Sequence, residues 1–261
     1  MPKWQKTPSI NAGMTQSCNE PQFISPQWPA PSNVKTLQST RLGGVSLPPY
    51  DSLNLGDHVE DNQQHVAQNR MVLEQSLPAT PLWLKQVHST LVVNEQQALT
   101  CPPADASFTR QKNQVCTVMT ADCLPVLFCN KAGTQVAAAH AGWRGLLDGI
   151  LENTLASFSD EPESILVWMG PAIGPAAFEV GQEVYEAFCT QQPSAQSAFK
   201  AVGQDGKWLA NLYALARLRL RQRGIENIYG GEFCTFSDEA RFFSYRRDGV
   251  CGRQASCIWL E

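Results

Sequence analysis

Apolar residues recur at helical spacing in four parts of the chain. In residues 61–77, Val66, Leu73 and Leu77 fall near one face, and Asp61 stands where an N-cap is expected. Residues 144–158 carry an amphipathic repeat, and Gly224 follows another such segment where a helix would stop. The pattern predicts four helices, over residues 61–77, 144–158, 181–188 and 208–221.

Shorter apolar runs rich in Val, Ile and aromatic residues predict strands. Pro125 interrupts one of these runs, so we expect a bend or a sheet edge there, because proline cannot donate a ladder hydrogen bond. Strands and helices interleave without a regular βαβ rhythm, which favours a mixed α/β (α+β) fold over a doubly wound dinucleotide fold. The predicted strands are 34–41, 81–87, 91–94, 114–129, 134–139, 165–169, 228–233 and 256–260.

The first twenty residues differ from the rest of the chain. Residues 1–20 are polar and show no periodicity, so we interpret them as a disordered leader. They have no apolar segment of the kind that a secretory signal carries. No repeat or linker divides residues 21–261, so we expect them to form one layered domain, with central mixed sheets flanked by helices and order beginning near Phe23.

Charge and hydropathy limit the classes of partner. The chain has 20 Lys and Arg against 24 Asp and Glu, a formal net charge of −4 and a pI near 5.6. Such a balance argues against a protein that grips nucleic acid or an anionic membrane through bulk charge. No apolar run approaches the roughly 18 residues that a membrane helix needs. We therefore expect neither nucleic acid nor membrane as a partner.

The nine cysteines are many for 261 residues, and their number is odd. Several lie inside apolar stretches, unlike the short, loop-rich spacing of a disulfide scaffold. Reduced thiols in the cytoplasm are the simplest interpretation, with most cysteines serving as small core residues. We expect no disulfide framework among Cys101, Cys116, Cys129, Cys189, Cys234, Cys251 and Cys257.

Two of the four histidines stand where a predicted strand meets a turn. These are His88 and His140, and Cys123 lies at a similar strand irregularity, whereas His58 and His65 lie in polar surroundings typical of a solvated surface. Imidazole and thiolate suit zinc, and three protein ligands leave an open position for water or substrate. The spacings of 35 and 17 residues match no compact zinc motif. A buried cysteine with two hydrogen-bonded histidines therefore remains the alternative.

Acidic and basic residues near these positions are further candidates. Asp105 or Asp122 could orient a ligand histidine, although an Asx turn or a cap is the commoner role for such a residue. Arg144 follows a strand-to-helix turn that suits an anion. Arg246, Arg247 and Arg253 form a basic cluster around Asp248, and either an anion clamp or a β-turn fixed by Arg–Asp pairing would explain it.

Two glycine turns carry the remaining candidates. Arg41 precedes Gly43 and Gly44, and Asn54 precedes Gly56. A polar side chain beside a tight turn could approach a ligand, and a plain surface turn would also account for both. With Arg144 and Arg246, these two residues make up the candidate substrate-binding set.

Ordered motifs from about Phe23 to the C-terminus resemble the laccase-domain family, which is also called the multicopper polyphenol oxidoreductase laccase or peptidoglycan editing factor family. The motifs are STRLGGVS, YDSLNLGDHV, WLKQVHS, ADASFT, TADCLPVLF, AAHAGWRGL, MGPAIGPAAFEVG and FFSYRRDGVCGRQASCIWL. The resemblance implies a layered α/β fold similar to the catalytic domain of cytotoxic necrotizing factor toxins. It also implies a catalytic metal site at His88, Cys123 and His140, with zinc as the metal and copper as the alternative.

The same resemblance implies an activity. Members of the family are regarded as purine nucleoside phosphorylases that convert adenosine, inosine and methylthioadenosine into the free base and ribose 1-phosphate, with adenosine deamination as a second activity. The expected partners are a purine nucleoside and phosphate, and the expected state is a monomer or a homodimer. Two alternatives stay open at this point. One is a Cys–His amide-processing enzyme that edits peptidoglycan precursors, and the other is a copper-dependent polyphenol oxidoreductase.

Overall fold

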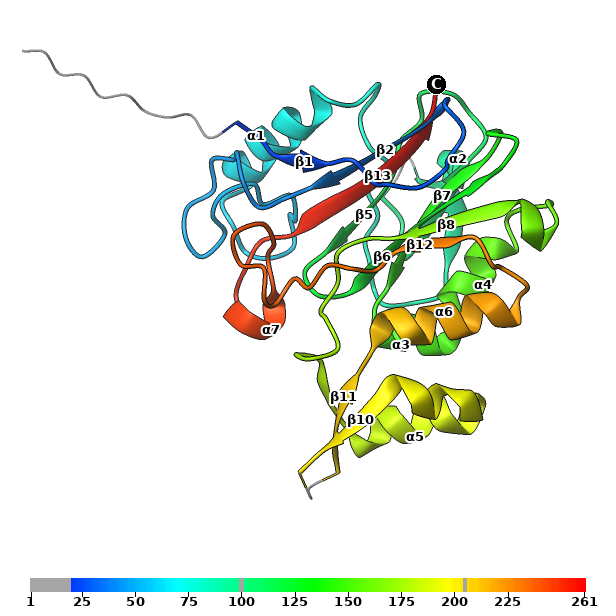
Figure 1. The fold of residues 1–261 in the computed structure, drawn as a ribbon. Helices are drawn as coiled ribbons and strands as arrows, with labels where there is room; N and C mark the ends of the chain where they lie inside the picture. Colours follow the sequence, from blue (N-terminus) through cyan, green and yellow to red (C-terminus); the bar gives the residue numbers. More distant parts are fainter. Residues whose placement is uncertain (1–19, 99–100, 204–205) are drawn as a thin grey trace, which may run out of the picture.

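The computed structural model describes residues 20–98, 101–203 and 206–261, and it has a mixed α/β fold with three sheets (Figure 1). This confirms the predicted fold class. The segment interpreted as a leader lies outside the described residues except for Glu20. Three sheets account for all thirteen strands of the described part, which are β1 (Phe23–Ile24), β2 (Val34–Ser39), β3 (Val92–Asn94), β4 (Ala106–Thr109), β5 (Cys116–Thr120), β6 (Leu124–Asn130), β7 (Val136–Ala141), β8 (Ile165–Met169), β9 (Glu179–Gly181), β10 (Phe199–Val202), β11 (Lys207–Ala210), β12 (Ile228–Gly230) and β13 (Gln254–Leu260).

Two of the sheets pack face to face. The six-stranded sheet has the order β12-β8-β6-β7-β4-β3, and the four-stranded sheet has the order β1-β2-β13-β5. Side chains from both sheets form one buried cluster between them, in which Val118 and Ile258 of the smaller sheet meet Leu127 and Trp168 of the larger. Burial of this apolar surface holds the two sheets together.

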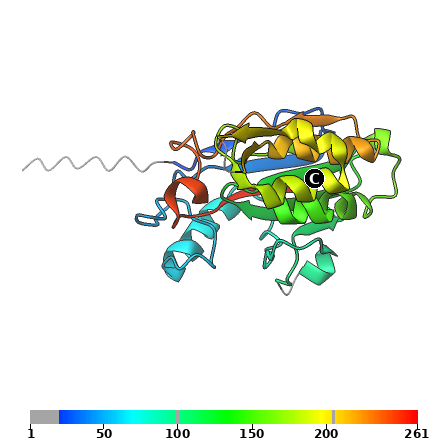
Figure 2. The same ribbon diagram turned by 90° about the horizontal axis from the view of Figure 1, so that it is seen from below.

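Helices cover the outer faces of this pair of sheets. The largest core cluster joins the six-stranded sheet to α3 (Trp143–Asp148), α4 (Ile150–Leu155) and α6 (Leu212–Gln222), and α1 (Gln63–Glu74) packs through Leu73 on the side of the four-stranded sheet. Figure 1 shows α1 and α5 (Gln182–Gln191) at opposite ends of the molecule, and in Figure 2 α1, in cyan, lies to one side of the yellow segment that contains α5. The sheet β10-β11-β9 packs with α5. The short helices α2 (Glu95–Ala98), α7 (Tyr245–Asp248), η1 (Pro162–Ser164) and η2 (Pro193–Ala198) complete the described elements.

The chain crosses from one sheet to the other between β5 and β6. Residues 121–123 make this crossing, and Asp122 adopts a left-handed φ of 89° there. The predicted break at Pro125 is therefore wrong, because the break lies three residues earlier. Pro125 lies inside β6 opposite His140, one residue from the start of the strand, where its missing N–H disrupts little of the ladder.

Three of the four predicted helices need correction. The N-cap of α1 is Asn62 rather than Asp61, whose carboxylate accepts from Ser46 and Asn54 instead. The segment 144–158 divides into α3 and α4 at Gly149. The start of the predicted helix 208–221 is strand β11, and α6 begins only after the N-cap Asn211. In each case a local hydrogen bond or a glycine backbone outweighs the apolar period.

Several strands also differ from the prediction. Residues 81–87 form no strand and make only isolated bridges through Leu82 and Lys85. Strands β1, β4, β9, β10 and β11 are not predicted from the sequence, because their short runs lack a clear alternating pattern. The C-terminal strand β13 belongs to the four-stranded sheet, whereas β12 belongs to the six-stranded sheet.

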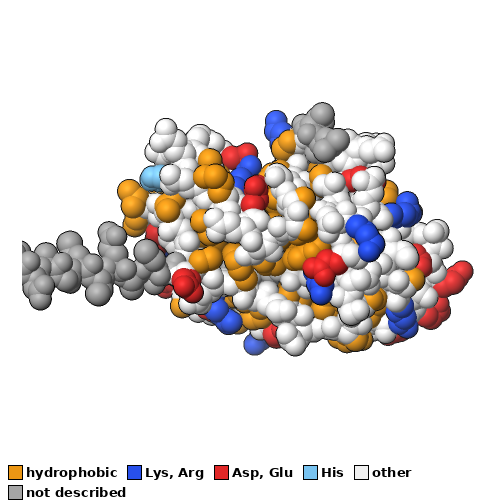
Figure 3. Space-filling view, turned by 90° about the horizontal axis from the view of Figure 1, so that it is seen from above, with side chains coloured by type: hydrophobic (Ala, Val, Ile, Leu, Met, Phe, Trp, Pro, Cys, Tyr) orange, Lys and Arg blue, Asp and Glu red, His pale blue; other side chains and the backbone are white. Residues whose placement is uncertain are grey.

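The distribution of surface charge and the state of the cysteines are consistent with the sequence composition. On the face in Figure 3, acidic and basic side chains are interspersed rather than gathered by sign. Within the described residues, no helix is long and apolar enough to cross a bilayer. All eight cysteines of the described part are free thiols, including the seven for which we expect no disulfide framework.

The split between α3 and α4 gives a testable prediction. Gly149 has a φ of 104°, and a Cβ added there would meet only ordinary contacts, the nearest at 3.6 Å. Gly149→Ala should therefore lower the free energy of unfolding by about 1–2 kcal/mol through backbone strain alone. Gly149→Asn should lose less, because asparagine adopts left-handed backbone more readily. Urea unfolding measures both, and equal stability of Gly149→Ala and the parent protein would contradict the strain.

Candidate metal centre

Three side chains from distant parts of the chain meet where the central strands of the six-stranded sheet, β6 and β7, begin and end. His88 lies in the loop before β3, with a left-handed φ of 59°, Cys123 lies at the crossing between the sheets, and His140 lies in β7. Their ligand atoms all fall within 4.8 Å of one another, and Cys123 Sγ is 3.7 Å from His88 Nε2. The structure thus brings together the two histidines and the cysteine that the sequence singles out.

The carboxylate of Asp105 holds both histidines in place. One oxygen lies 2.8 Å from His140 Nδ1 and accepts from the backbone N–H of His88 at 3.0 Å. The other accepts from the N–H and the hydroxyl of Ser89 at 2.6 and 2.7 Å. Asp105 is fully buried. With His140 Nδ1 engaged in this way, His140 Nε2 is the ring nitrogen left for a ligand.

Asp122, the other candidate, has a different role. Its carboxylate accepts from the Thr235 hydroxyl at 2.6 Å and from the backbone N–H of Arg246 at 2.6 Å. It thereby ties the crossing between the sheets to the segment that carries α7. Of the two aspartates, Asp105 alone contacts a histidine of the cluster.

Electrostatics in the cluster favour charged forms of its members. Burial alone would raise the pKa of Asp105, but hydrogen bonds from His140 and Ser89 outweigh it and lower that pKa to about 2. Burial likewise opposes the Cys123 thiolate, yet the charge and hydrogen bond of His140 lower the pKa of Cys123 below its usual value. Despite its own burial, His140 has a raised pKa because it faces Cys123 and Asp105.

The cluster fits a borderline-soft metal ion. Two imidazole nitrogens and one thiolate are the donors that zinc and copper accept, and three ligands leave a position open. The backbone beside the cluster is also shaped closely around the donors. A Cβ added at Gly142 would lie 2.7 Å from the His88 ring and 3.0 Å from Cys123 Sγ, so a larger residue there would displace the ligands. His88, Cys123 and His140 are thus the residues that could hold such an ion.

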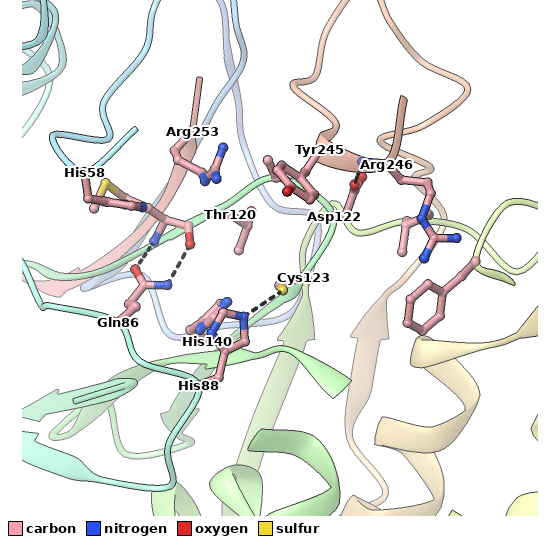
Figure 4. A pocket seen from close by; sticks show the side chains of 14 residues that line it. His58, Gln86, His88, Thr120, Asp122, Cys123, His140, Tyr245, Arg246 and Arg253 are labelled. Carbon is pink, nitrogen blue, oxygen red and sulfur yellow. Dashed lines mark hydrogen bonds between the residues drawn. The ribbon is translucent and has the colours of Figure 1, made fainter. Parts of the chain in front are cut away.

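A cavity of about 480 Å³ opens over the cluster (Figure 4). This volume is within the range of small-molecule sites. His88, Cys123 and His140 lie at its base in the view of Figure 4. In Figure 4, His58, Gln86, Thr120 and Arg253 lie on one side and Arg246 on the other, with Tyr245 between them. Two apolar lining residues belong to the side of Arg246, because the Arg246 guanidinium lies 5.6 Å from the centre of the Phe178 ring and the Ile173 N–H donates to the carbonyl of Asp122 at 2.9 Å.

The candidate substrate residues are divided by the structure. Arg246 lines the cavity. Arg144 is exposed, its guanidinium lies over the ring of Trp143 at 4.3 Å, and it is not among the lining residues. Arg41 bonds to Asp51 and Asn54 is fully buried among backbone and Asp61 contacts, so neither reaches the cavity.

The basic cluster of Arg246, Arg247 and Arg253 contains both an arginine that fixes a turn and arginines that line the cavity. Arg247 pairs with Asp248 at 2.7 Å and donates to the carbonyls of Thr235 and Phe242, as expected of a fixed turn. Arg246 and Arg253 instead line the cavity.

Several residues of the cavity escaped the sequence analysis, among them three polar residues. His58 was expected to be a solvated surface residue, and although half exposed it lines the cavity. Thr120 and Gln86 are not indicated by the sequence, because both lie in apolar or extended runs without a local motif. The sequence offers one signal for Thr120, its position three residues before Cys123 inside the predicted strand 114–129.

The comparisons with known proteins agree with one another on the relatives of this chain. The chain is 56% identical over 246 residues to purine nucleoside phosphorylase YfiH of Escherichia coli, covering 92% of this chain and 99% of the relative. It is 51% identical over 239 residues to a purine nucleoside phosphorylase of Pseudomonas aeruginosa, covering 92% and 98%. A crystal structure of a Neisseria meningitidis protein superposes with a TM-score of 0.89 at 55% identity, covering 92% and 99%.

A family model agrees with these relatives. The model described as multi-copper polyphenol oxidoreductase laccase matches residues 35–261, which include the cluster and every residue of the cavity. The chain therefore belongs to the multi-copper polyphenol oxidoreductase laccase family.

Proposed function

We propose that the protein is a purine nucleoside phosphorylase that acts on adenosine, inosine and methylthioadenosine, with adenosine deamination as a second activity. The observation that carries this proposal is the His88–Cys123–His140 cluster at the base of a cavity of about 480 Å³. Relatives that are 51% and 56% identical over nearly their whole length carry the name purine nucleoside phosphorylase, which supports it.

The reaction exchanges one bond at the sugar. An oxygen of hydrogen phosphate bonds to C1′ of the nucleoside, the bond from C1′ to the purine nitrogen breaks with its electron pair going to the base, and the phosphate proton ends on the base. The cavity walls hold the two substrates in reacting distance, which removes much of the entropic barrier. Buried Ile173 and Phe178 supply an apolar surface on which a purine ring can lie.

Zinc is the metal we propose for the cluster. When bound, zinc supplies a Lewis acid and lowers the pKa of water, chemistry that suits deamination at C6 of adenosine. The role of the chain's own residues is to hold His140 Nε2 and the Cys123 thiolate in fixed positions. Copper-dependent phenol oxidation has less support, because the four histidines of the whole sequence are too few for the several copper centres of a multicopper oxidase.

We further propose that the protein works in a reducing compartment such as the cytoplasm. The cysteines support this, because all eight in the described part of the chain are free thiols.

The first test of the proposal removes the thiolate. Cys123→Ala should abolish phosphate-dependent release of adenine from adenosine and strongly reduce bound zinc, because one of three ligands is lost. The folded structure should remain, because the side chain is small and lies in a connection rather than in a strand. Product chromatography, metal analysis and thermal unfolding measure the three properties.

Cys129 provides the matched control. It is fully buried in β6 and outside the cavity. Cys129→Ala should lower stability by about 1 kcal/mol and leave metal content and activity unchanged. Full phosphorolysis by Cys123→Ala would remove the cluster from the mechanism.

The second test concerns the support of the histidines. Asp105→Asn keeps the shape but removes the charge that faces His140, so zinc affinity should fall about 10- to 100-fold. Asp61→Asn is the control, since Asp61 is also buried and accepts hydrogen bonds from Ser46 and Asn54 but lies outside the cavity. Competition with a chromogenic chelator measures both affinities. Equal zinc affinity of Asp105→Asn and the parent would show that Asp105 only stabilises the fold.

A specific observation favours a second candidate function. Asp105, His140 and Cys123 stand in the order of an acid, a base and a nucleophile, and the lowered pKa of Cys123 is what an attacking thiol needs. A Cys–His enzyme that processes amides of peptidoglycan precursors would use the same three residues without a metal.

Chelation and alkylation separate the two candidates. If the phosphorylase proposal holds, dipicolinate should remove activity, added zinc should restore it, and bound zinc should slow alkylation of Cys123 by iodoacetamide. An amide-processing enzyme should keep its activity in chelator and lose it on addition of zinc, because the metal occupies the nucleophile. Amide release that survives chelation would therefore overturn the metal assignment.

A further inference from the structure

One arginine of the cavity has an unused hydrogen-bonding edge. Nη1 of Arg253 donates to the carbonyls of Cys251 and Gly252, each at 2.9 Å, which fixes the guanidinium. Across the part of the chain that the structure describes, its Nε and Nη2 form no hydrogen bond and no carboxylate lies within ion-pair distance of it. A fixed guanidinium with a free edge is a suitable donor for an oxyanion.

Beside this arginine lies a hydroxyl without a partner. Thr120 is only 2% exposed, and its Oγ1 is buried without a hydrogen bond. It lines the same cavity and, in Figure 4, projects into it. The pairing of β5 with β13 sets Thr120 opposite Gln254, the residue after Arg253. A buried hydroxyl that is unpaired costs free energy, which a ligand oxygen would recover.

His58 adds a third polar group on this side. His58 lines the cavity, and its Nδ1 lies 3.5 Å from a carboxylate oxygen of Asp57, which leaves Nε2 for a ligand. Burial lowers the pKa of His58, and the positive charge of Arg253 lowers it further. The cavity has one lining carboxylate, that of Asp122, and it already accepts from Thr235 and the Arg246 N–H. No acidic group of the lining therefore competes with a ligand anion for Arg253.

The other lining arginine lies on the apolar side of the cavity. Nη1 of Arg246 donates to the carbonyl of Glu179 at 2.9 Å, and its guanidinium lies 5.6 Å from the centre of the Phe178 ring. It secures the loop before β9 on the apolar side of the cavity. Within the described residues, Nε and Nη2 of Arg246 are also without a hydrogen bond, so what distinguishes Arg253 is the unpaired hydroxyl of Thr120 beside it.

We propose that Arg253, Thr120 and His58 form the subsite for the phosphate co-substrate, with the nucleoside base on the side of Ile173 and Phe178. This inference rests on the proposed phosphorylase function. The guanidinium edge and the threonine hydroxyl each meet a phosphate oxygen, and His58 faces a third. Placed there, phosphate and base lie on opposite sides of the cavity, with the sugar C1′ between them above the cluster.

The kinetic test varies phosphate at saturating nucleoside. Arg253→Met keeps the apolar stem that packs near Gly56 but removes the charge, so the phosphate KM should rise about 10- to 100-fold while the nucleoside KM changes less than about twofold. Arg253→Lys should recover part of the loss. Thr120→Val should raise the phosphate KM about three- to tenfold. Arg221→Met, on the exposed side of α6, is the matched control and should change neither KM.

Direct binding separates this inference from the proposed function. Calorimetric titration of the full-length protein with inorganic phosphate should give a binding signal that Arg253→Met loses and Arg221→Met keeps. If that pattern appears without any phosphorolysis by the parent protein, the subsite stands and the phosphorylase proposal fails.

Other outcomes would overturn the subsite. An unchanged phosphate KM in both Arg253→Met and Thr120→Val would do so. So would a rise in phosphate KM on Arg144→Met alone, which would move the anion to the start of α3. If Arg253→Met failed to fold, as judged by thermal unfolding, Arg253→Lys and Thr120→Val would decide the question.

Discussion

A single buried carboxylate organises the site. Asp105 sits just before β4, in the interior between the loop that carries His88 and the strand that carries His140, and it binds both. Its pKa, lowered to about 2, keeps it ionised at neutral pH. An ionised carboxylate out of contact with water requires donors on both oxygens, and the loop 87–89 and the His140 ring supply them. The requirement to satisfy this charge therefore fixes the positions of two proposed ligands at once.

The third ligand depends on how the two sheets are joined. β5 and β6 follow one another in sequence but belong to different sheets, so the three residues between them must turn at the seam. This turn gives Asp122 a left-handed backbone. It also places Cys123 at the start of β6, next to the end of β7 that carries His140. Cys123 is therefore placed by the packing of the sheets, while the histidines are placed by Asp105.

Parts of this arrangement can be predicted from the sequence. His88, Cys123 and His140 interrupt or end apolar runs, which is a local signal, and the irregular order of runs indicates the mixed fold. The position of Pro125 inside β6 could not be predicted, because which residue ends a strand depends on its neighbours in the sheet. The same holds for Arg253 and Thr120, which are 133 residues apart and meet only through the pairing of β13 with β5. Gly149 shows the converse, a local backbone conformation that overrides a helical pattern.

Charge explains why a metal cluster and a separate arginine would be needed in one cavity. The Cys123 thiolate and the Asp105 carboxylate carry two negative charges, which balance a bound zinc dication. A balanced centre can polarise a group that it contacts, but it offers little net attraction to a phosphate dianion at some distance. The overall charge of −4 opposes such an anion further. A local positive group with free donors, as Arg253 provides, is then the means by which this chain can bind phosphate beside the cluster.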